Sequence, residues 1–123
     1  MSGTLFFKAP LSGSTDGRPI SISNSAGSAT TIHTAVSGTS DLDEIWLWAD
    51  MRNNPTGLPE KLTILWGGTG TADEVTHNLR LNEVTTIVPG WVLRNGLIIK
   101  AYGGSGSGDI NIYGYVNEVR ANQ

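Results

Sequence analysis

The chain has 123 residues, 8 basic and 11 acidic side chains, a formal net charge of −3 and no cysteine. This length suits one domain, and the lack of cysteine excludes disulfides and thiolate metal sites. Without a basic run, a surface for duplex nucleic acid is not expected. The chain also lacks a run of about 20 apolar residues or a signal-peptide leader, so we expect no membrane contact and no translocation.

Residues 1–18 contain one short apolar patch, formed by Leu5, Phe6 and Phe7, which precedes the turn-forming stretch LSGSTDGRP. A lone apolar patch cannot offset the entropy of ordering its own segment. The pattern therefore predicts an N-terminal arm over 1–18 that docks on another surface. Residues 19–123 are expected to form the folded domain.

Beyond the arm, apolar residues recur with a period of two, and Gly, Pro, Asn and Ser interrupt them at short intervals. The Asn95-Gly96 pair between two apolar runs predicts a hairpin with a type I′ turn. About eight short strands favour an all-β, single-domain antiparallel β-sandwich of jelly-roll type, with a small barrel as the alternative. The predicted strands are 20–23, 28–36, 44–52, 60–68, 74–80, 84–90, a hairpin within 91–102, and 109–120.

The segment 44–52 carries large side chains on both faces. Ile45, Leu47, Ala49 and Met51 alternate with Trp46 and Trp48. A half-buried strand would be polar on its second face, so something is expected to cover the two tryptophans. Three explanations stay open: cover by the arm or loops of the same chain, a subunit or partner interface, and a platform for stacking sugars.

The segment DINIYGYVNEVR, residues 109–120, has an aliphatic face and a face on which Tyr113 and Tyr115 alternate with amides. A tyrosine combines an apolar ring with a hydroxyl that suits a wet boundary. Gly114 between them is expected to permit close approach of another chain. We expect this tyrosine face to be a rim or interface, with a buried position in the sandwich as the alternative.

No catalytic set is evident. His33 and His77 are isolated on strands, and a catalytic role would require one of them to reach a carboxylate in a cleft. Asp41, Asp43 and Glu44 lack the spacing of a calcium loop. The glycine-rich stretches at 67–74 and 103–109 open no helix and lack the lysine of a phosphate-binding loop. We therefore expect no enzyme activity, no catalytic or metal site and no cofactor.

Several stretches together resemble small structural proteins of tailed-bacteriophage virions. They are KAPLSGSTDGRPISI, TIHTAVSGTSDLDEIWLWADM, LTILWGG, VPGWVLRNGLIIKAY and INIYGYVNEV. The resemblance implies a non-enzymatic decoration or cement protein that binds the major capsid protein on the capsid exterior after assembly in the host cytoplasm. A position in the neck or tail is the alternative within that group, and a carbohydrate-binding β-sandwich module is the alternative outside it.

For a shell protein of this kind we expect a homo-oligomer, most simply a trimer, in which each arm inserts its apolar patch against a capsid subunit or a neighbouring copy. Several weak contacts made by one oligomer act together through effective concentration. The expected partner-binding residues are Leu5, Phe6, Phe7, Trp46, Trp48, Tyr113 and Tyr115.

Overall fold

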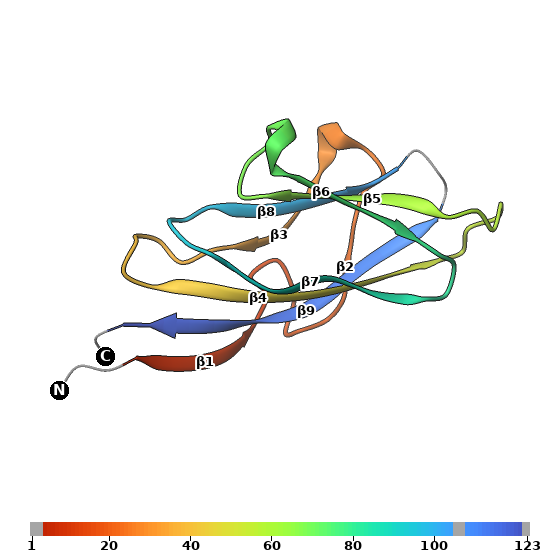
Figure 1. The fold of residues 1–123 in the computed structure, drawn as a ribbon. Coiled ribbons are helices and arrows are strands. Elements are labelled where there is room, and N and C mark those ends of the chain that lie inside the picture. Colours follow the sequence, from red (N-terminus) through yellow and green to blue (C-terminus); the bar gives the residue numbers. More distant parts are fainter. Residues whose placement is uncertain (1–3, 105–107, 122–123) are drawn as a thin grey trace.

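The structure is a computed structural model that describes residues 4–104 and 108–121, and these residues form two packed antiparallel sheets (Figure 1). Two short 3-10 turns are the helical elements of this part of the chain, and none of its helices is long and apolar enough to cross a membrane. The elements are β1 (Leu5–Pro10), β2 (Ile20–Ser21), η1 (Ala26–Ser28), β3 (Thr30–Thr34), β4 (Leu42–Arg52), β5 (Glu60–Trp66), η2 (Thr71–Asp73), β6 (Glu74–Leu79), β7 (Val84–Leu93), β8 (Ile98–Gly103) and β9 (Asp109–Arg120).

The strand order is that of a jelly roll. One sheet has the order β1-β9-β4-β7, with β2 also paired to β9, and the other has the order β3-β8-β5-β6. Successive strands mostly alternate between the two sheets, so each sheet covers the apolar face of the other. The predicted all-β sandwich is confirmed. The described residues form nine strands, but β1 and β2 follow one another along the same side of β9, which leaves eight strand positions.

Alternating apolar residues from both sheets fill the space between them. On β4 and β9, Ile45, Leu47, Ile110 and Ile112 are fully buried, while their chain neighbours point outward. This separation follows from the two-residue period of a strand. The same alternation places the core residues Leu62, Ile64, Ile99 and Ala101 on the facing strands β5 and β8.

The β7–β8 hairpin turns at the predicted position, and Asn95 and Gly96 have φ angles of 67° and 69°. Such positive values are what a type I′ turn requires of both central residues. Several strand ends differ from the prediction by one to three residues, and β7 continues past the predicted end at Gly90 to Leu93. Its edge position explains this: a proline at a sheet edge need not donate to a ladder, and Gly90, with a φ of 85°, forms a bulge opposite β4.

Part of the segment predicted as an arm lies in the sheet. β1 pairs with β9 in an unbroken antiparallel register from Leu5 opposite Arg120 to Pro10 opposite Tyr115. Residues 11–13 then cross to the other sheet, where Leu11 is buried and the Gly13 amide donates to the Ile32 carbonyl. The apolar patch at the start of β1 nevertheless stays exposed, with Leu5 at 44%, Phe6 at 70% and Phe7 at 48%.

The opposite side of the sandwich is closed between β6 and β7. The Nε2 atom of His77 on β6 donates to the carbonyl of Ile87 on β7 over 3.0 Å. Nearby in the sheets, Trp66 of β5 and Trp91 of β7 make an edge-to-face contact with ring centroids 5.4 Å apart. The histidine bond joins the edge strands β6 and β7, and the ring contact joins β7 to the inner strand β5, so His77 has a structural role here.

Candidate functional site

The outer face of the β1-β9-β4-β7 sheet carries a row of aromatic and proline side chains. The registers place Pro10, Tyr115, Trp46 and Pro89 beside one another across four strands. Trp48 lies two residues further along β4 and faces Tyr113 on β9. We call Trp46, Trp48 and Tyr115 the aromatic cluster. No strand or 3-10 turn of the described residues is stacked on this face of the sheet (Figure 1). Pro19, in the loop before β2, lies beside Asp50 and Tyr113 at one end of the face.

In the aromatic cluster, Trp46 stacks on Trp48 and on Tyr115 with interplanar angles of 19° and 17°, and Trp48 and Tyr115 are tilted by 33°. Their centroids are 6.2 Å apart for Trp46 and Trp48, 6.4 Å for Trp46 and Tyr115, and 6.0 Å for Trp48 and Tyr115. All three side chains are partly buried. β1, within the segment predicted as an arm, lies beside β9, and its Lys8 side chain lies over the Tyr115 ring. The three explanations for the tryptophans therefore stay predictions.

Polar groups hold the rim of the aromatic cluster. One carboxylate oxygen of Glu44 accepts the Trp46 Nε1 proton over 2.8 Å and the Asn117 amide proton over 2.9 Å. These two donors, the tryptophan first, lower the pKa of Glu44 from its ordinary value. Glu44 and Asn117 therefore set the orientation of the Trp46 ring.

The two hydrogen bonds to Glu44 should make the stability of the fold depend on pH. Because the folded-state pKa is below the unfolded one, their stabilising effect is complete above the ordinary carboxyl range and is lost as the pH falls through the lowered pKa. We expect Trp46→Phe, which removes the donor, to raise the pKa of Glu44 in an NMR titration. Trp48→Phe is the control, and an equal rise in both variants would contradict the assignment.

Lys8 is a member of the site that the sequence analysis did not identify. Its Nζ lies 4.5 Å from the centroid of the Tyr115 ring, in a cation–π contact that places a charge on the outer face. Lys8 is also opposite Asn117 in the β1–β9 register. Only the pairing of β1 with β9 brings this residue to Tyr115, so the sequence carried no local signal for it.

Two glycines give the aromatic cluster its room. A Cβ atom on Gly90 would come within 2.8 Å of Cζ2 of Trp46, so the indole packs directly on the β7 backbone. A Cβ atom on Gly114 would overlap the carbonyl oxygen of Trp46. The backbone that approaches Gly114 closely is therefore the chain's own β4.

Tyr113 lies at the other end of this face. Desolvation by burial, followed by the nearby negative charge of Asp50, raises the pKa of its hydroxyl. The hydroxyl thus stays protonated at neutral pH and remains able to donate a hydrogen bond. Tyr113 and Tyr115 both lie on the outer face, beside Trp48 and Trp46 respectively, and the rim or interface expected of this face stays a prediction.

His33 does reach a carboxylate, but the pair is buried. Its Nε2 lies 2.8 Å from Oδ2 of Asp43, and the side chains are only 5% and 3% exposed. The backbone amide of Ser12 donates to the other ring nitrogen, Nδ1, over 3.0 Å. Arg120 binds the second oxygen of Asp43 over 3.0 Å. Because both ring nitrogens are occupied and the pair is buried, the group ties β3, β4, β9 and the segment around Ser12 together and offers a substrate no access.

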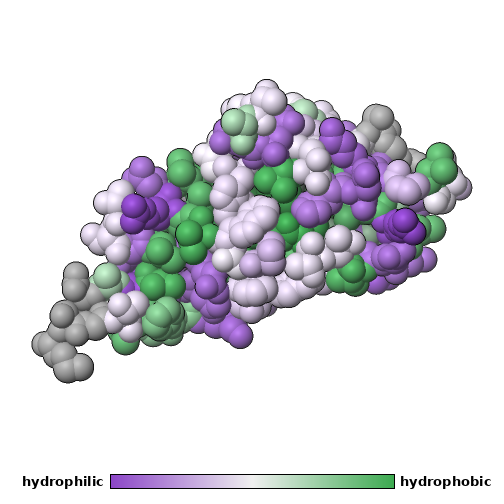
Figure 2. All heavy atoms as spheres, in the orientation of Figure 1, coloured by the Kyte–Doolittle hydropathy of each residue, from purple (hydrophilic) through white to green (hydrophobic). Residues whose placement is uncertain are grey.

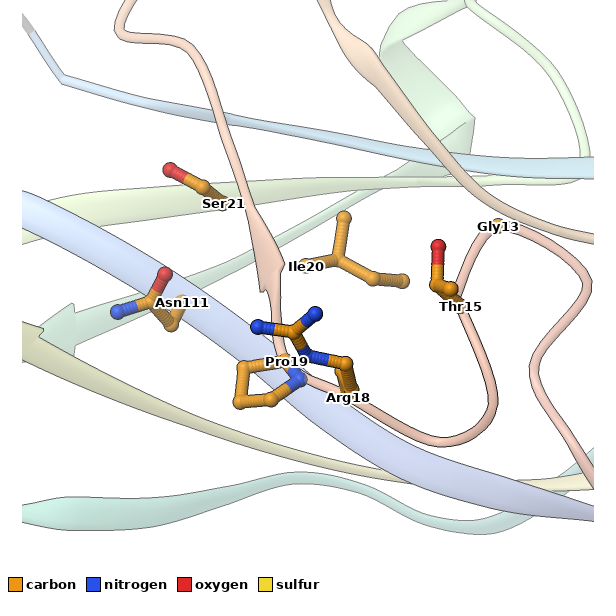
Figure 3. A pocket seen from close by; sticks show the side chains of 7 residues that line it. All are labelled: Gly13, Thr15, Arg18, Pro19, Ile20, Ser21 and Asn111. Atoms are coloured by element: carbon orange, nitrogen blue, oxygen red, sulfur yellow. The ribbon is translucent and has the colours of Figure 1, made fainter.

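A shallow pocket lies beside β2 (Figure 3). Arg18 is its one charged lining residue. The lining contains no histidine or carboxylate that could act as a base toward the hydroxyls of Thr15 and Ser21. Nor do the described residues contain a group of three His, Asp or Glu side chains placed to hold a metal ion. The pocket is lined by Gly13, Thr15, Arg18, Pro19, Ile20, Ser21 and Asn111.

Comparison with known proteins gives a fold and no family. No family model and no curated protein matches the chain. A solved structure from Bacillus endospore appendages, described as disulfide-linked pili, is similar with a TM-score of 0.52 and 10% identity, covering 99% of this chain and 90% of that one. A chain of the T13 particle of IBDV is similar with a TM-score of 0.54 and 13% identity, covering 96% of this chain and 31% of that one. At these identities the likeness shows the fold alone.

Proposed function

We propose that the protein is a non-enzymatic structural component of a virion, and that it binds the major capsid protein as a decoration or cement protein on the capsid exterior. The observation that supports this proposal is the partly exposed aromatic cluster of Trp46, Trp48 and Tyr115 on the outer face of the sheet. Tryptophan and tyrosine are enriched in the centres of protein interfaces, where they contribute most of the binding energy.

The structural comparisons support a role in an assembly without specifying it. One neighbour belongs to a viral particle and the other to a pilus, so this sandwich occurs in subunits of large assemblies. The tailed-phage resemblance supplies the capsid as the partner. A position in the neck or tail would use the same surface, and the trimer expected from the sequence stays a prediction.

The binding test uses the aromatic cluster. We expect Trp46→Ala with Trp48→Ala to leave a folded sandwich, because both rings lie outside the core, and to weaken binding to shells of the major capsid protein at least tenfold. Each lost ring pair contributes about 0.5–1.5 kcal/mol to folding, so circular dichroism must confirm the fold first. Binding is measured by co-sedimentation with shells that lack the protein.

Two further variants separate binding from folding. Thr86→Lys leaves the cluster intact and adds a long charged side chain opposite Trp48 on the outer face, so it should also weaken shell binding. Trp91→Ala removes a tryptophan that is 38% exposed and packs against Trp66 away from this face, so it should bind normally. Normal binding by both the double variant and Thr86→Lys would refute the proposed surface.

A carbohydrate-binding module is the second candidate, favoured by the amide of Asn117 and the carboxylate of Glu44 beside the tryptophans. Sugars stack on the flat faces of such rings. Glycan-array binding that is lost in the Trp46 variant or in Trp91→Ala, with no binding to shells, would replace the capsid proposal with this one.

A further inference from the structure

The apolar edge of the first sheet offers a second interaction surface, separate from the aromatic cluster. β1 is the last strand of its sheet, and no described residue pairs with it on the side away from β9. Unpaired edge strands present a row of backbone donors and acceptors on which another strand can add. Within the described part of β1, only Ala9 packs against the core, whereas Leu5, Phe6 and Phe7 are all exposed.

The other sheet edges carry features that discourage pairing. β7 contains Pro89 and two register shifts relative to β4. β3 has a register shift between Thr31 and His33, and residues 12 and 13 bond to it along its edge. β6 is bonded to β7 through His77. Bulges, prolines and covering segments are the usual means by which proteins protect edges.

β1 lacks such protection over its first three residues. Its register with β9 runs from Leu5 to Pro10 without a shift, so its first half is a regular strand. Lys8 is its one charged residue, and the ammonium group lies over the Tyr115 ring on the outer face of the sheet. The charge is therefore directed away from the edge, and Pro10 limits pairing only at the far end.

We propose that the occupant of this edge is β1 of a second copy of the chain, in an antiparallel pair centred on Phe6. That register places Phe6 opposite Phe6, Leu5 opposite Phe7, and Lys8 opposite Thr4, so no like charges face each other and Pro10 lies outside the apolar centre. Aromatic and aliphatic cross-strand pairs stabilise such a ladder. The same residues meet on both copies, as a two-fold interface requires.

The contact joins two sheets into one continuous sheet across the dimer axis. Figure 1 shows β1 at the margin of the molecule, beside the end of β9. Figure 2 shows apolar residues gathered at this end of the molecule. Because one edge accepts only one strand, this contact closes at two copies, so the proposal gives a dimer where the sequence analysis expects a trimer. It leaves the aromatic cluster free for a different partner.

A cysteine introduced at position 6 tests the register directly, since the natural chain has no cysteine. Residues directly opposite in an antiparallel pair have Cα atoms about 4.5–5.5 Å apart, which suits a disulfide. Under mild oxidation, Phe6→Cys should form a covalent dimer at least tenfold faster than Leu58→Cys. The control is matched, because Phe6 is 70% exposed and Leu58, in the β4–β5 loop, is 65% exposed.

Light scattering coupled to size exclusion gives an independent reading. The unmodified protein should have the mass of two chains, and Phe6→Glu should raise the dimer dissociation constant at least tenfold, while Leu58→Glu leaves it unchanged. A single-chain or three-chain mass at all concentrations would overturn the proposal, as would equal crosslinking rates for the two cysteine variants. Neither readout involves capsid shells, so a failure of the dimer proposal can be told apart from a failure of the proposed function.

Discussion

Replacing Gly114 by alanine is expected to lower the free energy of unfolding by about 3 kcal/mol, a large part of the roughly 5–15 kcal/mol that stabilises a typical domain. A Cβ atom at this position would overlap the carbonyl oxygen of Trp46 and come within 3.1 Å of the Leu47 Cα. Both obstacles are backbone atoms of the central strand β4, so relief requires β4 and β9 to separate. The urea midpoint of unfolding measures the loss.

Gly27→Ala is the control for this substitution. Its added Cβ would meet only the Ser25 hydroxyl at 3.8 Å, and its φ is not positive. We expect a change of at most about 0.5 kcal/mol, or a slight gain from the stiffer unfolded chain. If Gly114→Ala unfolds at the same urea concentration as the unmodified protein, the close approach of β4 to Gly114 is not a constraint on the fold.

Replacing Asp43 by alanine is expected to cost about 3–5 kcal/mol, because it leaves the other members of a buried network without their acceptor. Asp43 accepts hydrogen bonds from His33, from the Val36 amide and from Arg120, at 2.8, 3.2 and 3.0 Å. These donors come from β3, the loop that follows it, and β9. Loss of the carboxylate therefore weakens the attachment of one sheet to the other.

Arg52→Ala is the matched control, since it removes a salt bridge of similar length on the same strand. Arg52 binds Asp50 over 3.2 Å, but its side chain is 65% exposed. Asp50 is itself buried, with its side chain 7% exposed, but water screens the exposed guanidinium, so we expect removal of Arg52 to cost less than removal of Asp43, about 1 kcal/mol. Similar urea midpoints for Asp43→Ala and Arg52→Ala would contradict the expectation that the buried Asp43 network contributes more to the free energy of unfolding than the Arg52 pair.

The aromatic cluster illustrates how much of the site local sequence could predict. The alternation in 44–52 and 109–120 correctly assigns Trp46, Trp48, Tyr113 and Tyr115 to the faces opposite the aliphatic residues. That these two faces are the same face of one sheet depends on the pairing of β4 with β9, which joins residues more than 60 positions apart. No local pattern encodes that pairing.

The N-terminal segment illustrates the opposite case. The apolar patch of this segment is recognisable in the sequence. Its pairing partner is not, because β9 lies at the other end of the chain. The structure places Leu5–Pro10 on β9, and so brings Lys8 to Tyr115 and leaves Phe6 at a sheet edge. Both the missed member of the site and the proposed dimer contact result from this long-range pairing.

By itself, the sequence determined the all-β class, the hairpin at Asn95-Gly96 and the division of each long strand into an inner and an outer face. Each of these depends on the period of a strand or on the φ angles of a turn, which are properties of neighbouring residues. Only the tertiary structure decided which strands are neighbours, that His33 and Asp43 are buried together, and that β1 is an edge. Those features depend on contacts between residues distant in the chain, where packing of the two sheets selects one register among many.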